Sequence, residues 1–160
     1  MRWCLPAQPP PAAPAARPPP LALAAHRTAP RPPHRRLSSP PRYLQLKIKD
    51  SDDANILAPF EEVYAFVEEA RRNSGACLLH CIAGMSRSAS LVIAYVMRRD
   101  SLSLLAAVEF VKARRPMVSP NVGFMRQLIA HERAATGTVS VDIDAYAADR
   151  FGHPDGYRIR

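Results

Sequence analysis

The sequence predicts an α/β fold, in which the strands of a sheet pack against helices. Two observations carry this prediction. The apolar run at residues 76–79 is typical of a short buried strand, and residues 91–97, which follow after a turn, are apolar around most of a helix circumference. Residues 43–48 alternate apolar and polar side chains, which is the period of a second strand. We therefore expect strands and helices to follow one another along this part of the chain.

Proline and glycine delimit the first elements. The strand at residues 43–48 runs into an acidic loop at residues 49–55, and Pro59 then suits the first turn of a helix. Gly75 ends that helix just before the second strand. The predicted helix carries an apolar stripe formed by Phe60, Val63, Tyr64, Val67 and Ala70.

Two further helices are expected after the buried one. The first is predicted to be capped by Ser103 and to stop at Pro116. The second is predicted to have Ser119 as its cap and Pro120 in its first turn, and to end near Gly137. Residues 138–160 show too little periodicity for an assignment and are expected to form a loose C-terminal extension.

Composition divides the chain at residue 42. Residues 1–42 hold thirteen of the seventeen prolines and seven arginines without an acidic residue, so almost all of the formal charge of +8 lies there. Such a segment cannot bury a core, and we expect a disordered tail with polyproline II character. The charge then belongs to a tail and not to a folded surface, so no nucleic acid partner is expected. The expected domain comprises residues 43–137.

The three cysteines argue against a disulfide framework. Cys77 and Cys81 lie on one expected strand, about 13 Å apart if it is extended, which is too far for a disulfide bond. Packing within the strand is the favoured role of Cys77. A reduced protein of the cytoplasm, the nucleus or both is therefore expected. No apolar run approaches the roughly eighteen residues of a membrane helix, so no membrane association is expected.

The most informative segment is residues 80–90, which read His-Cys-Ile-Ala-Gly-Met-Ser-Arg-Ser-Ala-Ser. Cys81 falls on a tight turn between a strand end and a helix start, where backbone N–H groups converge and the helix dipole favours an anion. Gly84 lets the backbone approach closely, and Arg87 adds a planar charged fork suited to two phosphate oxygens. The same positive field is expected to lower the pKa of Cys81. A thiolate in a phosphate cradle is a nucleophile aimed at phosphorus, which indicates a phosphatase.

This segment resembles the active-site loop of cysteine-dependent protein phosphatases of the protein tyrosine phosphatase superfamily. Residues 83–88, Ala-Gly-Met-Ser-Arg-Ser, resemble the dual-specificity subgroup, and the resemblance extends from about Tyr43 to about Glu132. It implies a protein tyrosine phosphatase-like central sheet flanked by helices, and it implies neither a metal ion nor another cofactor. Family domains begin with further strands ahead of the segment that matches Tyr43. Here the proline-rich tail is expected to stand in their place.

Phosphoester cleavage by a thiolate also needs an acid to protonate the departing oxygen, and then a base to activate water. On the residues alone, Asp50, Asp52 and Asp53 of the acidic loop are all candidates. The resemblance selects Asp50, because the family's general acid lies a few residues past the strand and ahead of an asparagine, here Asn55, that leads into the helix.

The resemblance also implies roles for the remaining site residues. Ser88 matches the hydroxyl that hydrogen-bonds the leaving thiolate. His80 matches a histidine that steadies the thiolate from behind, with a satisfied core histidine as an equal alternative. Asn121 matches a position that supports the loop, with a plain helix-start residue as the alternative. The substrate phosphate is expected to be bound by Ile82, Ala83, Gly84, Met85, Ser86 and Arg87.

Three functions are consistent with these residues. The first is an active dual-specificity phosphatase of phosphorylated proteins, with mitogen-activated protein kinases as a family-level expectation. The second is a pseudophosphatase that binds phosphoproteins without turnover because its scaffold is shortened. The third is an adaptor whose tail binds SH3 or WW domains through the Arg-x-x-Pro-x-x-Pro pattern at residues 27–33. The presence of Cys81, Arg87 and Asp50 together favours the first.

Overall fold

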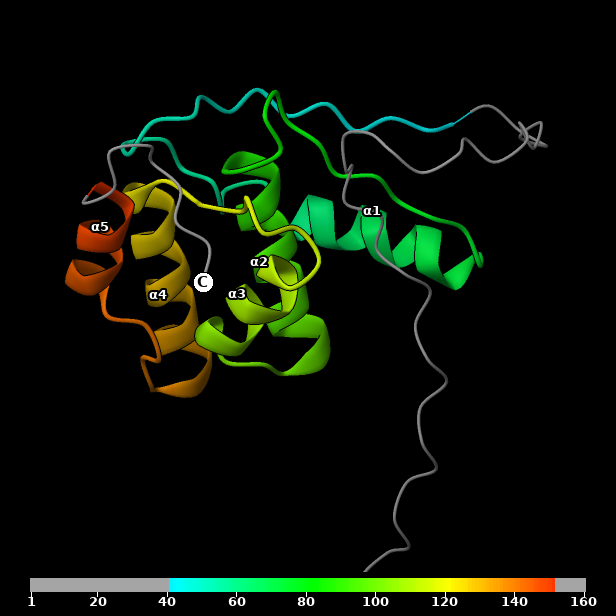
Figure 1. Ribbon diagram of the computed structural model, residues 1–160. Helices are drawn as coiled ribbons and strands as arrows, with labels where there is room; N and C mark the ends of the chain where they lie inside the picture. Colours follow the sequence, from blue (N-terminus) through cyan, green and yellow to red (C-terminus); the bar gives the residue numbers. More distant parts are fainter. Residues whose placement is uncertain (1–40, 152–160) are drawn as a thin grey trace, which may run out of the picture.

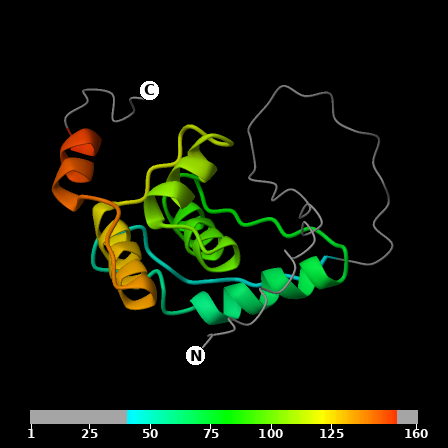
Figure 2. The ribbon, with the colours of Figure 1, turned by 90° about the horizontal axis from the view of Figure 1, so that it is seen from below.

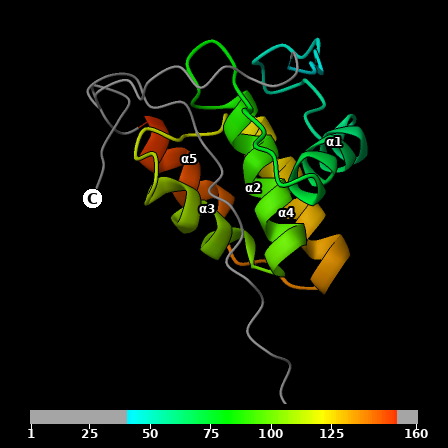
Figure 3. The ribbon, with the colours of Figure 1, turned by 90° about the vertical axis from the view of Figure 1, so that its right-hand side faces the viewer.

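The computed structural model of the chain describes residues 41–151. Helix α2 lies at the centre, with α1, α3 and α4 packed against it and α5 packed on α4 (Figure 1, Figure 3). The helices of this part are α1 (Phe60–Arg72), α2 (Arg87–Asp100), α3 (Leu104–Lys112), α4 (Val122–Thr136) and α5 (Ile143–Phe151).

Helix α2 forms the middle of the hydrophobic core, as its apolar sequence predicts. Its residues 88–97 are all buried, although a surface helix would bury only one face. Side chains from the neighbouring helices and from the loop before α1 complete the core. The largest fully buried side chains of the whole core include Tyr95, Phe124, Ile56, Ile93, Leu104, Met125 and Leu128.

Two of the predicted helices form close to their predicted limits. Helix α1 begins directly after Pro59, and three members of its apolar stripe, Phe60, Val63 and Val67, are buried. Helix α3 is capped by Ser103, whose side chain accepts a hydrogen bond from the N–H of Ala106 at 3.3 Å. These predictions are confirmed. They could be made from the sequence because a helix cap and an apolar stripe depend on residues that are close together along the chain.

The predicted start of α4 is wrong by two residues. Asn121 is the cap, and its Oδ1 accepts the N–H of Phe124 at 2.7 Å. Ser119 instead donates its N–H to the carbonyl of Met85, far away in sequence. The helix ends, as predicted, at Gly137, which adopts a left-handed conformation with φ of 73°.

The prediction of a loose extension at residues 138–160 is wrong for residues 143–151. These residues form α5, and Ile143 and Tyr146 pack against the core. A helix of nine residues is too short to be stable alone, so tertiary packing holds it and periodicity could not reveal it. Residues 152–160 lie outside the described part.

Neither predicted strand is formed within residues 41–151, which contain no β-strand. Residues 43–48 and 76–80 run as irregular chain past α1 and toward the start of α2 (Figure 1, Figure 2). A strand needs a ladder of backbone hydrogen bonds to a neighbour, and in the described part no backbone hydrogen bond joins these two segments.

The alternation that suggested the strands is nevertheless visible in the burial pattern. Leu44, Leu46 and Ile48 pack against the core, whereas the residues between them are exposed. Cys77 and Leu79 likewise face inward, and Leu78 is 56% exposed. The expected sidedness of both segments is therefore correct, and only the backbone pairing is missing.

The predicted disordered tail at residues 1–42 lies outside the described residues, apart from its last two positions. None of the helices between residues 41 and 151 combines the length and apolar character needed to cross a bilayer.

Candidate active site

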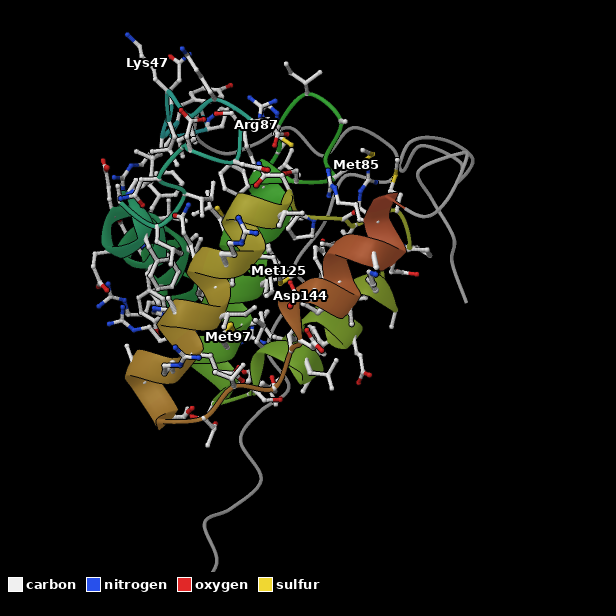
Figure 4. All side chains as sticks on the ribbon, turned by 90° about the vertical axis from the view of Figure 1, so that its left-hand side faces the viewer. Lys47, Met85, Arg87, Met97, Met125 and Asp144 are labelled. Carbon is white, nitrogen blue, oxygen red and sulfur yellow. The ribbon has the colours of Figure 1, made fainter. Side chains whose placement is uncertain are left out.

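The candidate site is the loop at residues 81–86 together with the first turn of α2, here called the phosphate loop. It follows segment 76–80, whose Cys77 and Leu79 pack against the core, and it leads directly into the buried helix, so both of its ends are fixed by the core. Gly84 has φ of 66°, a conformation that side-chain-bearing residues rarely adopt, and this turns the loop back over Cys81. Figure 4 shows Arg87 and Met85 at the same end of the molecule, away from Met97 at the far end of α2.

Cys81 is half-buried, and hydrogen-bond donors from its own loop surround its sulfur. The N–H of Gly84 donates to Sγ at 3.2 Å, and the hydroxyl of Ser88 donates to it at 3.3 Å. Burial raises the pKa of the Cys81 thiol, but hydrogen bonds from the Ser88 hydroxyl and from the N–H groups of Ser88, Gly84 and Met85 outweigh it. The pKa of Cys81 is therefore lowered, and the thiolate is favoured.

Cys77 behaves in the opposite way. Burial raises the pKa of its thiol. Cys77 is thus a packing residue facing the core, as the sequence indicates, and Cys81 has the environment of a nucleophile.

Arg87, the first residue of α2, lies between the phosphate loop and the end of segment 43–48. Its Nη1 donates to the carbonyl oxygen of Ile48 at 3.3 Å, and its Nε lies 3.5 Å from Oδ2 of Asp50. That Nε is buried, and within the described part it has no hydrogen-bond partner. In this state the guanidinium is held beside Asp50 by charge, with donor capacity left for an anion.

Asp50 is fixed to the phosphate loop by hydrogen bonds as well as by this ion pair. Its Oδ1 accepts the hydroxyl of Ser86 at 2.7 Å and the side-chain amide of Asn121 at 3.0 Å. The N–H of Asn121 in turn donates to Oγ of Ser86 at 3.0 Å. Three residues separated by 36 and 71 positions therefore close one polar cluster.

The other acidic-loop residues are placed elsewhere. Oδ1 of Asp52 accepts the N–H of Gly123 at 3.3 Å, which ties the loop to the start of α4. Asp53 is fully exposed, and a hydrogen bond from Ser51 lowers its pKa. Asn55 accepts the N–H groups of Leu57 and Ala58, so it shapes the turn that leads into α1.

Arg115 is a site residue that the sequence analysis missed. It is buried, with 6% of its surface exposed, and it donates from Nε to the carbonyl of Gly84 at 3.0 Å and from Nη2 to that of Ala83 at 3.1 Å. These bonds hold the outer side of the phosphate loop. No signal in the sequence distinguishes it, because its neighbour Arg114 is also an arginine but is exposed.

Other predicted site residues contribute less to the cluster. His80 is exposed, which contradicts the core-histidine alternative, and the side-chain donor to Cys81 in the described part is Ser88 and not His80. Ile82 is 90% exposed and Ala83 is also exposed, and the carbonyl of Ala83 accepts a hydrogen bond from Arg115. Ser88 donates its hydroxyl to Sγ of Cys81, and Asn121 donates its side-chain amide to Asp50.

The arrangement suits attack on a bound phosphoryl group. The thiolate lies at the start of a buried helix whose dipole favours an anion, and it is ringed by N–H groups. The permanently charged guanidinium of Arg87 lies beside Asp50, whose carboxylate is hydrogen-bonded to Ser86 of the phosphate loop. A thiol with a lowered pKa, donors for an anion and a carboxyl group able to exchange a proton are thereby assembled at one end of α2.

Comparisons with known proteins agree with this geometry. The family model described as "Dual specificity phosphatase, catalytic domain" matches residues 21–134, so the match begins before residue 43 and outside the described part. Human dual specificity protein phosphatase 14 is 46% identical over 99 residues, which cover 62% of this chain and 50% of that protein. Dual specificity protein phosphatase 1 of Arabidopsis thaliana is 42% identical over 86 residues, which cover 54% and 43% of the two chains.

Solved structures give the same result. The crystal structure of human DUSP28 is 41% identical, with a TM-score of 0.54, and covers 56% of this chain and 63% of that one. The structure of the human tyrosine phosphatase-like serine/threonine/tyrosine-interacting protein is 37% identical, with a TM-score of 0.57 and coverage of 59% and 62%. These likenesses support a protein tyrosine phosphatase-like α/β fold. The chain spans about half the length of the curated relatives that it matches. With a family model covering residues 21–134 and the cysteine loop built as described, the chain belongs to the dual specificity phosphatase catalytic domain family.

Proposed function

We propose that this protein is a dual-specificity protein phosphatase that hydrolyses phosphotyrosine and phosphoserine or phosphothreonine through a phosphocysteine intermediate. The observation that carries the proposal is the Cys81 sulfur, ringed by donors that lower its pKa, at the head of a buried helix. A cysteine kept only for packing is expected to resemble Cys77, whose pKa is raised by burial.

In the first step, Sγ of Cys81 attacks phosphorus, and the bond from phosphorus to the tyrosine, serine or threonine oxygen breaks. The departing oxygen takes a proton from the protonated carboxyl of Asp50. Arg87 turns from Asp50 to the phosphoryl oxygens, and the loop N–H groups bind the negative charge that they carry. The product is a phosphocysteine and a free hydroxyl on the substrate.

In the second step, water attacks the phosphocysteine and gives a proton to the Asp50 carboxylate. The sulfur–phosphorus bond breaks, inorganic phosphate leaves, and the thiolate is restored. Ser88 stabilises that thiolate, because its hydroxyl already donates to Sγ in the free state. No oxidant, metal or second substrate beyond water is required by this scheme.

The test is turnover of an aryl phosphate and of phosphopeptides by purified residues 1–160, compared with Cys81→Ser. Wild-type protein should turn over both, whereas Cys81→Ser should lose turnover and keep binding of a phosphate analogue, since a serine hydroxyl is not ionised near neutral pH. Equal activity in the two proteins would refute the nucleophile. Binding of phosphopeptides by wild type without turnover would instead favour the pseudophosphatase alternative.

The role of Asp50 needs variants that separate proton transfer from positioning, because its carboxylate also anchors Ser86 and Asn121. Asp50→Asn keeps an acceptor oxygen in the same place but cannot donate a carboxyl proton. We expect Asp50→Asn to slow alkyl phosphates far more than aryl phosphates with good leaving groups, which barely need protonation. Asp52→Asn is the matched control; if it shows this leaving-group signature and Asp50→Asn does not, the assignment of the acid is wrong.

The substrates within this class are phosphoproteins, with mitogen-activated protein kinases as the first to be assayed. Binding of SH3 or WW domains by the tail, and a location in the cytoplasm or nucleus, complete the proposal. Each is tested directly, by dephosphorylation of purified kinases, by pull-down with residues 1–42, and by imaging of the tagged full chain.

A further inference from the structure

Helix α5 lies outside the residues matched by the family model, which end at 134. It nevertheless reaches the segment between α3 and α4, here called the linker (residues 113–121). The hydroxyl of Tyr146 donates to the carbonyl of Pro120 at 2.7 Å. Nη1 of Arg150 donates to the carbonyl of Ser119 at 2.7 Å, to its Oγ at 2.9 Å, and to the carbonyl of Pro120.

The linker is in turn bonded to the phosphate loop along its outer side. Ser119 donates its N–H to the carbonyl of Met85 at 2.9 Å, and Asn121 donates its N–H to Oγ of Ser86. Ser119 is therefore shared: Arg150 binds its carbonyl and hydroxyl, and the phosphate loop takes its N–H. Ser119 therefore links Arg150 of α5 directly to Met85 of the loop that carries Cys81.

These contacts act on groups that matter for the thiolate. The N–H of Met85 is one of the donors that lower the pKa of Cys81, and the carbonyl of the same residue is the one held by Ser119. Ser86 is the N-cap residue of α2, and its hydroxyl holds Asp50. A change in the position of the linker would therefore shift both the donor ring and the carboxylate.

Both side chains that bond α5 to the linker are partly buried. Tyr146 packs against the core with its hydroxyl directed at the linker, and burial raises the pKa of that phenol. Arg150 is half-buried and is permanently charged, so its bonds to two carbonyls are charge-assisted. In Figure 4, α5 runs from Asp144 in the middle of the molecule toward the end where Met85 lies.

We propose that α5 supports the phosphate loop from outside the family core, and that Tyr146 and Arg150 are positioning residues for the reaction. They act through Ser119 and the linker and do not touch the substrate. The inference deepens the proposed function and rests on it for its effect on turnover. Its effect on the Cys81 thiolate stands apart from turnover and can be measured without it.

The experiment uses the full chain with Tyr146→Phe, with Arg150→Gln, and with both changes. The matched controls are Tyr64→Phe, a half-buried tyrosine on α1, and Arg126→Gln, an exposed arginine on α4. The first readout is the pH dependence of alkylation of Cys81, followed on its own peptide by mass spectrometry so that Cys77 does not contribute. The second is kcat and KM on an aryl phosphate, and the third is the midpoint of unfolding in urea.

We expect the double variant to raise the pKa of Cys81 and to lower kcat roughly tenfold, which is less than the roughly hundredfold loss that a displacement of about 1 Å can cause. KM should change little. Arg150→Lys, which keeps the positive charge, should retain more of kcat than Arg150→Gln. Both controls should match wild type. If the alkylation profile and kcat of the double variant equal those of the controls, α5 is only a structural element and the inference is wrong.

Two outcomes need a second measurement: a double variant that does not fold, and a wild-type protein without turnover. Should the double variant fail to fold, Tyr146→Phe alone decides, because it removes one hydroxyl without a change of shape. Should wild-type protein show no turnover, the proposed function fails. The alkylation profiles of folded variants and controls still decide whether α5 positions the loop.

Discussion

Ser88→Ala is the change that most directly tests how the thiolate is formed. The hydroxyl of Ser88 donates to Sγ of Cys81 at 3.3 Å, and among the hydrogen bonds to this sulfur it lowers the pKa of the thiol most. The side chain is 4% exposed, so alanine leaves little room for a replacement water. The backbone N–H of Ser88, and those of Gly84 and Met85, stay in place. The variant therefore removes one donor from a group of four.

The expected size follows from the cost of one hydrogen bond to a charged group, which is about 1.5 kcal/mol at the lower end of its range. The lower end applies because sulfur is a weak acceptor. That energy corresponds to roughly a tenfold smaller acid dissociation constant for Cys81. The pKa of the thiol rises, so the acidic limb of the rate profile moves to higher pH.

The assay is the alkylation rate of the Cys81 peptide across pH, with Ser90→Ala as the matched control. Ser90 lies two positions further along, is fully buried, and donates to the carbonyl of Ser86 instead of to sulfur. Ser88→Ala should slow alkylation below the pKa by roughly tenfold, and Ser90→Ala should not. In turnover, Ser88→Ala should also show a burst of aryl alcohol, because thiolate departure in the second step becomes slow. An unchanged alkylation profile in Ser88→Ala would refute the reasoning.

Three further predictions concern the scaffold of the site. Gly123→Ala should lower the free energy of unfolding by about 1–3 kcal/mol, because the added Cβ would lie 2.0 Å from the backbone oxygen of Asp52. This loss is expected although alanine favours helices, and a variant as stable as wild type in urea would contradict it. Arg115→Lys should lower kcat and raise KM on an aryl phosphate, since the fork that binds two loop carbonyls is lost, whereas Arg114→Lys on the exposed neighbour should do neither. Burial raises the pKa of the Glu132 carboxyl, but hydrogen bonds from two N–H groups and a hydroxyl outweigh it and leave that pKa below its ordinary value. The stability that Glu132 contributes is complete above the ordinary pKa and is lost as the pH falls through the lower folded one. Glu132→Gln should therefore cost about 2 kcal/mol near neutral pH and flatten the acid slope of urea unfolding; an unaltered slope would show that another group is responsible.

Local patterns predicted the local features of this chain. The cap at Ser103, the buried stripe of α1 and the end of α4 at Gly137 each depend on residues within one helical turn. The same holds for the phosphate loop, since the donors to Cys81 lie within seven residues of it. Sequence reasoning could therefore predict a low-pKa thiol at this position, and the direction of the shift is as predicted.

Other features follow from contacts between distant segments, which leave no local pattern. Ser119 satisfies every local rule for a helix cap, but its groups are taken by Met85 and Arg150, and Asn121 becomes the cap. Two adjacent arginines, 114 and 115, are indistinguishable in sequence, and only the second reaches the loop.

The alternation of apolar and polar residues at positions 43–48 determined which side chains face the core. In an extended segment successive side chains point to opposite sides, so this pattern depends on the segment's own residues. Whether that segment forms a strand depends on hydrogen bonds to a partner, and within the described residues none is formed. The sequence by itself thus determined the lowered pKa of the Cys81 thiol, the turn that surrounds it and the inward faces of the elements. Only the tertiary structure decided which arginine, which cap and which C-terminal helix hold that turn in place, because those choices rest on atoms brought together from more than thirty positions apart.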